Sequence, residues 1–314
     1  MIRTPICDLL GIQYPIFQGG MAWIADADLA AAVSNGGGLG IIAAGNAPAD
    51  YVRQQVQKAK SLTDKPFGVN VMLMSPSADE VAQVLAEEKV PVVTTGAGNP
   101  SKYMGIWQEA GIKVIPVVPS ANMGKLMERC GATAVIAEGG ESGGHIGEIN
   151  TMPLVPQVVD AVSIPVLAAG GIGDGRGIAA AFMLGAVGVQ VGTRFLVAKE
   201  CNVHQNYKNK VLKAKDTDTI TTGKRLGHPV RSLKTPFSRG YAKEEYSTIS
   251  DDDLEALAVG ALRLAAVEGD EKRGCFLCGE IAGMVKKEQP AAEIIAEMFA
   301  QAEEVLKGAS RWLR

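Results

Sequence analysis

The chain has 314 residues, of which 47% are hydrophobic, and its 31 basic and 34 acidic side chains leave a net charge of −3. This length allows one large α/β domain with additions or two modest domains, and we expect the single large domain. The balanced charge and the absence of lysine- or arginine-rich runs exclude a nucleic-acid partner, and the lack of a secretion signal or of a window of about 18 apolar residues predicts a soluble, cytoplasmic protein with no membrane partner.

Short apolar runs rich in valine and isoleucine recur along the first two-thirds of the chain, and each ends in glycine or a polar residue. They predict eight strands at residues 15–18, 39–43, 67–71, 90–94, 113–117, 132–137, 165–169 and 187–192. Amphipathic patterns between them predict helices at residues 26–35, 49–60, 78–88, 101–109, 123–129, 154–161 and 175–184. Apolar strands joined by helical crossovers imply a parallel sheet. Eight such units favour a closed (β/α)8 TIM barrel over an open doubly wound sheet.

After the eighth predicted strand the chain becomes polar. Residues 198 to about 250 carry many lysine, aspartate and threonine residues and show no barrel-type strand. We interpret this stretch as a cap inserted after strand eight that forms a wall for substrate and nucleotide; the alternative is a solvated surface excursion. Helical patterns at residues 252–267 and 291–307 are expected to close the barrel wall. The predicted domain bounds are residues 1–197 plus about 270–314 for the barrel and about 198–269 for the cap.

The five cysteines are an odd, scattered set, so we expect reduced thiols rather than a disulfide framework. Cys275 and Cys278 have metal-ligand spacing, and Cys201 with His204 could complete a tetrahedral zinc site. The two pairs are separated by roughly 70 residues, far from a finger-like interval. We therefore favour ordinary thiols and predict no metal.

The ends of the predicted strands are rich in glycine, and barrel active sites lie at these ends. Gly170 and Gly171 follow strand seven, and Gly192 and Thr193 follow strand eight. Backbone N–H groups in such loops bind phosphate; the alternative is turn glycines that tolerate positive φ. The run "GGIGDGRG" partly imitates a dinucleotide fingerprint, but no acidic residue ends a later strand at the required distance. With further glycines after strands one and six, the barrel mouth has room for a flat ring, and flavin mononucleotide (FMN) fits that description.

Six segments in order carry a family resemblance. They are "PIFQGGMAWIADADLAAAVSNGGGLGIIAAGN", "KPFGVNVML", "VTTGAGNPSKYM", "AEGGESGGHIG", "IPVLAAGGIGDG" and "VQVGTRF". Together they resemble the flavin-dependent enoyl-[acyl-carrier-protein] reductase II family, which is itself similar to the nitronate monooxygenases. The resemblance runs from about residue 4 to residue 197 and continues more loosely through "GHPVRSLK" and "GEIAGMV".

The resemblance implies a homodimeric FMN enzyme that uses NADH or NADPH to reduce the trans-2 double bond of an enoyl chain on acyl carrier protein, the last step of each fatty acid elongation cycle. One departure is Ser142, where many relatives carry alanine, and we expect it to be tolerated. The implied FMN contacts agree with the strand-end positions: Gly20 and Met21 beside the ring, Asn70 and Glu138 on the ring or ribityl chain, and Gly171, Gly192 and Thr193 at the phosphate.

His145 lies among the five glycines of residues 137–147 and matches the histidine that both families keep over the flavin. We expect the glycines to let this loop lie flat against the ring. The imidazole could then hydrogen-bond a carbonyl or supply a proton. The resemblance implies hydride transfer from flavin N5 to the β-carbon of the enoyl thioester, and His145 is the predicted catalytic donor to the thioester oxygen. The alternative for a lone histidine is a structural residue.

The sequence defines the roles of four further polar residues less well. Glu141 either orients His145 or faces solvent. His204 is assigned no chemistry, whereas His228 and Arg231 could meet the phosphopantetheine of acyl carrier protein or the nicotinamide nucleotide.

We therefore predict an NAD(P)H-dependent enoyl-thioester reductase. Nitronate monooxygenase is the alternative, and a non-catalytic barrel that binds a phosphate ligand is a minor one. The segment "TTGAGNPSKYM" and the long polar cap favour the reductase.

Overall fold

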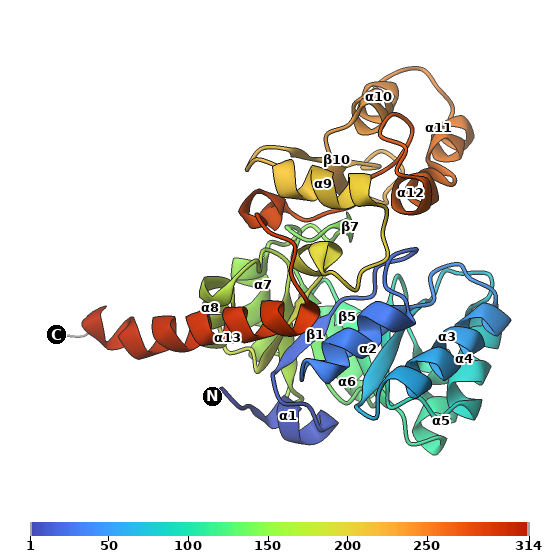
Figure 1. The fold of residues 1–314 in the computed structure, drawn as a ribbon. Coiled ribbons are helices and arrows are strands. Elements are labelled where there is room, and N and C mark those ends of the chain that lie inside the picture. Colours follow the sequence, from blue (N-terminus) through green and yellow to red (C-terminus); the bar gives the residue numbers. More distant parts are fainter. Residues whose placement is uncertain (1, 313–314) are drawn as a thin grey trace.

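The computed structural model describes residues 2–312 and contains a barrel of eight parallel strands surrounded by helices (Figure 1). The strand order around the sheet is β1-β9-β8-β6-β5-β4-β3-β2, and the predicted (β/α)8 TIM barrel is confirmed. All eight predicted strands are present, with ends that differ by three residues or fewer. The strands are β1 (Ile16–Gln18), β2 (Gly40–Ala43), β3 (Phe67–Met72), β4 (Val92–Gly96), β5 (Lys113–Val118), β6 (Val135–Glu138), β8 (Val166–Ala169) and β9 (Gly188–Val191).

The barrel closes between β1 and β2, where a side chain takes part in the strand pairing. The two strands share one parallel bridge, Phe17 with Leu39. Beyond it, the buried amide of Gln18 accepts a hydrogen bond from Ile41 N at 3.1 Å and donates one to Ile41 O at 3.2 Å. The Gln18 side chain thus satisfies both backbone groups of a residue that would otherwise lack a strand partner at this seam.

Helices fill the crossovers as predicted. Several begin at a side-chain cap: Asp26 accepts from Leu29 N, Ser120 from Met123 N and Asp174 from Arg176 N. The crossover helices are α2 (Ala27–Asn35), α3 (Ala49–Leu62), α4 (Ala78–Glu87), α5 (Ser101–Glu109), α6 (Ala121–Arg129), α7 (Thr151–Val159) and α8 (Gly175–Met183).

Two further helices complete the barrel. The long helix α13 (Ala291–Lys307) packs against α8 and α2 and supplies the missing wall element, as its pattern predicted (Figure 1). It is followed by a short 3-10 helix, η4 (Gly308–Trp312). Helix α1 (Pro5–Leu10) was not predicted; its buried Ile6 and Leu10 join the core cluster inside the lower end of the barrel. The bottom of the barrel is therefore filled, and the opposite end is left for a site.

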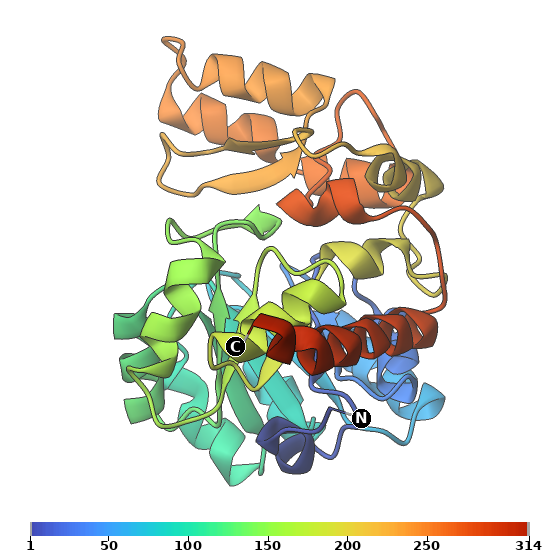
Figure 2. The same cartoon turned by 90° about the vertical axis from the view of Figure 1, so that its left-hand side faces the viewer.

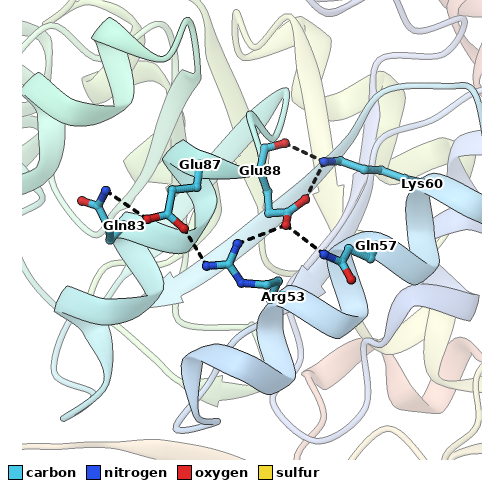
Figure 3. Close-up of polar contacts among 6 residues, drawn as sticks. All are labelled: Arg53, Gln57, Lys60, Gln83, Glu87 and Glu88. Carbon is cyan, nitrogen blue, oxygen red and sulfur yellow. Dashed lines mark hydrogen bonds and ion pairs between the residues drawn. The ribbon is translucent and has the colours of Figure 1, made fainter.

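The outer helices α3 and α4 are joined by a polar network on the barrel surface (Figure 3). The Glu88 carboxylate accepts from Arg53 at 3.2 Å, from Gln57 at 3.1 Å and from Lys60 at 2.7 Å. Arg53 also reaches Glu87 at 2.6 Å. Because Glu88 is mostly buried, these charged hydrogen bonds fix how α4 lies on α3.

Between β9 and α13 the chain leaves the barrel strands, and most of this stretch forms a cap over one end of the barrel (Figure 1). The helical pattern at residues 252–267 was expected in the barrel wall, but it lies in this cap. Its helix α11 buries one residue, Leu254, whereas α13 buries a full stripe and so suits the wall. The elements here are η1 (Thr193–Val197), α9 (Gln205–Lys213), β10 (Thr219–Thr222), β11 (Val230–Leu233), α10 (Pro236–Glu244), α11 (Asp251–Ala258), α12 (Ala261–Arg263), η2 (Leu264–Glu268) and η3 (Glu280–Met284).

A small antiparallel sheet connects the cap to the barrel loops, and the sequence did not predict it. Its order is β10-β11-β7, and β7 (Gly144–His145) lies beneath the cap hairpin (Figure 2). The division into a barrel of residues 1–197 plus about 270–314 and a cap of about 198–269 stays a prediction. Within residues 2–312, no helix combines the length and apolar character needed to cross a bilayer.

Candidate functional site

A cavity of about 410 Å³ lies where the carboxyl ends of the barrel strands face the cap. Its volume falls within the range of roughly 300–1,000 Å³ that is usual for small-molecule sites. All the residues predicted for the site lie in its wall, although they come from five strand ends. They are Gly20, Met21, Asn70, Glu138, His145, Gly170, Gly171, Gly192 and Thr193.

One side of the cavity presents unpaired backbone donors. Within the part of the chain that the structure describes, the amide N–H groups of Gly171, Gly192 and Thr193 have no hydrogen-bond partner. The Thr193 hydroxyl accepts a bond from Gly279 N at 2.8 Å, which leaves its own proton free to donate. These donors come from the loops after β8 and β9 and make a cradle for an anion such as a phosphate.

The opposite side is lined by the first and third strand ends. A Cβ on Gly20 would lie 2.4 Å from the Cβ of Asn70, so glycine is required there to admit that side chain. Asn70 Nδ2 donates to Thr94 Oγ1 at 3.0 Å, which fixes the amide in the cavity wall. Met21 lies close to Gly192 and so connects this side to the anion cradle.

The end of β6 supplies two polar groups. Desolvation raises the pKa of Glu138 from its usual value near 4.5 to about 7. In the same wall, the buried hydroxyl of Ser142 lies close enough to this carboxyl to offset part of that rise, although it makes no hydrogen bond of normal geometry among the described residues. A carboxyl that titrates near neutral pH and an unsatisfied hydroxyl are groups that a polar ligand would complete.

His145 lies at the edge of the cavity in residues 139–147, which we call the histidine loop. Its ring is solvent-accessible, yet the surrounding chain removes enough water to lower the pKa of the imidazole, and the nearby His228 lowers it further. The ring is therefore neutral near pH 7, with one N–H donor and one acceptor. Within the described residues no hydrogen bond to the imidazole is present, so the donor is available to a ligand.

One glycine of the histidine loop is required for contact with another part of the chain, and the flat approach of this loop to a ring stays a prediction. A Cβ on Gly143 would lie 2.5 Å from the carbonyl carbon of Cys278, so this glycine admits residues 277–281, which we call the return segment.

Glu141 neither contacts His145 nor simply faces solvent, the two alternatives that the sequence left open. Its carboxylate accepts from the N–H of Thr151 at 2.9 Å and from its hydroxyl at 2.8 Å, which anchors the loop to the start of α7.

The four residues that were considered as zinc ligands, and not favoured, do not form a metal-binding group within the described residues. No group of three or more histidine, cysteine, aspartate or glutamate side chains within residues 2–312 is placed to hold a metal. Burial raises the pKa of Cys275 to about 11 and raises that of Cys278 further, so both thiols stay protonated near pH 7. His204 uses Nδ1 to accept from Asn206 N at 3.1 Å at the start of α9.

Sequence reasoning missed part of the wall. Leu277, Cys278, Gly279 and Ile281 of the return segment line the cavity although they follow the whole cap in the chain. The only signal was the loosely recognised "GEIAGMV". Ala97, also in the wall, has a left-handed backbone with φ of 55°, a strain that its sequence does not reveal.

Comparison with known proteins places this geometry in context. The model of the nitronate monooxygenase family matches residues 3–301. The structure of FabK from Thermotoga maritima is 50% identical, with a TM-score of 0.97 and coverage of 100% of both chains. A 5-hydroxy-7a-methyl-1-oxo-octahydro-1H-indene-4-carboxyl-CoA dehydrogenase from Mycobacterium tuberculosis is 40% identical over 74% of this chain and 67% of that protein. A probable nitronate monooxygenase from Staphylococcus saprophyticus is 32% identical over 97% of this chain and 99% of that protein.

Proposed function

We propose that this chain, which belongs to the nitronate monooxygenase family, is an FMN-dependent enoyl-[acyl-carrier-protein] reductase. It is an oxidoreductase, as its relatives are. The observation that carries the finer proposal is the full-length similarity to FabK, an enoyl-acyl-carrier-protein reductase II, at 50% identity. The proposed reaction reduces the trans-2 double bond of an enoyl thioester at the expense of NADH or NADPH, in the last step of fatty acid elongation.

A thioester substrate has independent support. The M. tuberculosis relative at 40% identity is named as a dehydrogenase of a carboxyl-CoA compound, so a protein of similar sequence acts on a substrate carried as a coenzyme A thioester. We propose acyl carrier protein as the partner that delivers the enoyl chain here, with the cap as the wall on which substrate and nucleotide lie. The proposal also includes a cytoplasmic homodimer.

The residues in the cavity fit FMN. The amides of Gly171, Gly192 and Thr193, with the Thr193 hydroxyl, would hold the phosphate beside Gly170. Gly20, Met21 and Asn70 would lie along the ring, and Glu138 would meet the ring or ribityl chain with the unsatisfied Ser142 hydroxyl beside it. When bound, FMN would supply the hydride that the β-carbon of the substrate receives.

His145 is proposed to stabilise the charge that develops on the thioester oxygen. Its neutral imidazole carries one N–H donor at the cavity edge and has no competing acceptor within the described residues. A fixed donor aimed at a charge that appears only in the transition state accelerates the reaction more than it tightens substrate binding. The return segment packs against the histidine loop at Gly143.

A nitronate monooxygenase is the second candidate. The family model and the S. saprophyticus relative carry that name, and the proposed flavin site would serve either reaction. The monooxygenase would be reduced by alkyl nitronates and would depend little on a nicotinamide cofactor.

Steady-state assays of the purified protein separate these functions. The proposal predicts a yellow protein that releases one FMN per chain and oxidises NADH or NADPH, with oxygen excluded, only when crotonyl-thioester is added. The saturated thioester should accumulate in equal amount. Release of FAD instead of FMN would refute the cofactor, and turnover of alkyl nitronates alone would favour the monooxygenase.

A further inference from the structure

The two halves of the histidine loop are held by different parts of the molecule. The first half is tied to the barrel, because Gly140 N donates to Ile149 O at 3.0 Å and Glu141 binds Thr151. The second half is tied to the cap, because β7 pairs with β11 and Ile146 N donates to Pro229 O at 3.0 Å. The position of His145 therefore depends on how the cap is joined to the barrel.

Arg231 makes that junction with its side chain. It lies in β11 opposite Gly144, and its side chain is 15% exposed. Its guanidinium donates from Nη2 and Nε to the single carbonyl oxygen of Gly140, at 2.9 and 3.2 Å. Its Nη1 reaches Glu280 Oε1 at 3.0 Å and Thr219 Oγ1 at 3.4 Å.

Arg231 and its partner Glu280 both also bind the backbone of the histidine loop. Glu280, which pairs with Arg231, donates its backbone N–H to the carbonyl of Glu141 at 3.0 Å. Arg231 thus joins three separate segments: the start of the histidine loop, the cap hairpin and the residues at the end of the return segment. A planar guanidinium can do this because its donors point in fixed directions, whereas a lysine ammonium is a single point of charge.

We propose that Arg231 is a positioning residue that sets the location of the His145 imidazole at the cavity edge. The proposal differs from the sequence-based expectation that Arg231 could meet the substrate or nucleotide, and it is favoured because most of the guanidinium donors already bind other residues of the protein. The inference rests on the proposed function, since it concerns the residue proposed to bind the thioester oxygen.

The first test compares Arg231→Met with Arg225→Met. Arg225 is a matched control: it lies in the same cap hairpin, donates to Ile249 O at 2.7 Å and pairs with Asp251, but it does not contact the histidine loop. In the FMN-loaded enzyme, Arg231→Met should lower kcat with crotonyl-thioester on the order of 10- to 100-fold, with KM changed little. Arg225→Met should stay close to the wild type, and Arg231→Lys should recover part of the loss.

A double-mutant cycle with His145→Ala shows whether Arg231 acts through the histidine. If it does, Arg231→Met should cost almost nothing more once His145 is removed. Losses that add in full, or equal losses in Arg231→Met and Arg225→Met, would overturn the proposal. Should the methionine variant fail to fold, Arg231→Lys and Arg225→Lys provide the same comparison.

Amide hydrogen exchange supplies a readout that does not need activity. Peptides covering residues 139–147 should exchange faster in Arg231→Met than in the wild type and in Arg225→Met. Unchanged exchange would overturn the proposal. If the wild type does not reduce enoyl thioesters at all, the proposed function fails, while the exchange experiment still decides whether Arg231 fixes the loop.

Discussion

At the scale of single residues, Gly171 and Gly192 both border the anion cradle but differ in backbone conformation. Gly171 has φ of +69°, so any side chain there strains the backbone whether or not a ligand binds. Gly192 has φ of −106°, and a Cβ on it would come no closer than 3.7 Å to the Met21 sulfur. Gly192 is therefore the better position for testing the cradle.

Gly192→Val should fold normally and lose FMN affinity, because its branched side chain would occupy the approach to the unpaired amides. We expect the dissociation constant for FMN to rise on the order of 100-fold, equivalent to about 2.7 kcal/mol of binding free energy. Flavin fluorescence during titration of the FMN-free protein measures this. Gly105→Ala, on the outer helix α5 with open space around it, should bind FMN like the wild type. Full flavin retention in Gly192→Val would place the phosphate elsewhere.

Glu138 should make stability depend on pH near neutrality. Its carboxyl has a pKa of about 7 in the folded protein instead of about 4.5, so the folded state holds the proton more tightly. The resulting stabilisation is complete below pH 4.5 and is lost as the pH rises through 7. Glu138→Gln stays neutral, so the melting temperature of this variant relative to the wild type should rise between pH 5 and pH 8, with FMN removed from both. A difference that is independent of pH would show that the carboxyl is well solvated.

At the scale of secondary-structure elements, the seam between β1 and β2 depends on Gln18. Gln18→Leu keeps the side-chain size but leaves the N–H and C=O of Ile41 without partners. We expect it to cost about 2–3 kcal/mol of unfolding free energy, measured by urea denaturation. The surface residue Gln108 is the control, since its hydrogen bond to Gly131 is exposed and Gln108→Leu should cost less than about 0.5 kcal/mol. Equal urea midpoints for both variants would mean that the seam needs no side chain.

The contact between α3 and α4 should depend on Glu88 far more than on Glu87. Glu88→Ala removes a mostly buried carboxylate with three side-chain partners and should cost about 1–2 kcal/mol, whereas Glu87→Ala should leave the unfolding free energy close to the wild-type value because that side chain is exposed. The hydrogen bond from Lys60 lowers the pKa of Glu88, so this stabilisation is present above its usual pKa near 4.5 and is lost as the pH falls through the folded-state value. Urea denaturation at pH 7 and at low pH measures both effects. Equal costs for the two variants would show that burial of Glu88 adds nothing.

The strands could be predicted because each alternates with a helix at regular spacing, and this local pattern determines a barrel. Helix α1 escaped prediction because its six residues give too few turns for a periodic signal. The two-residue strand β7 escaped because it exists only through pairing with β11, far along the chain. The placement of α11 was wrong because an amphipathic pattern does not say which surface the helix will cover.

At the scale of the whole molecule, the strand-end glycines and His145 could be found from the sequence because the carboxyl ends of parallel strands meet at one end of a barrel. The return segment could not, since Gly279 meets Thr193 only after the chain has passed through the entire cap. Gly143 and Arg231 likewise owe their roles to contacts between segments that are far apart in the chain. Local sequence therefore identifies the barrel half of the site, and only the folded chain reveals the cap half.

The anaerobic reoxidation of the reduced flavoenzyme by crotonyl-thioester tests the central claim most directly. In a stopped-flow experiment without oxygen, the wild type reduced by NADH or NADPH should return to the oxidised flavin spectrum when the thioester is added. His145→Ala should retain FMN and be reduced at nearly the wild-type rate, yet reoxidise on the order of 10² to 10³ times more slowly. A wild-type flavin that stays reduced with the thioester and reoxidises only when oxygen is admitted would contradict the account.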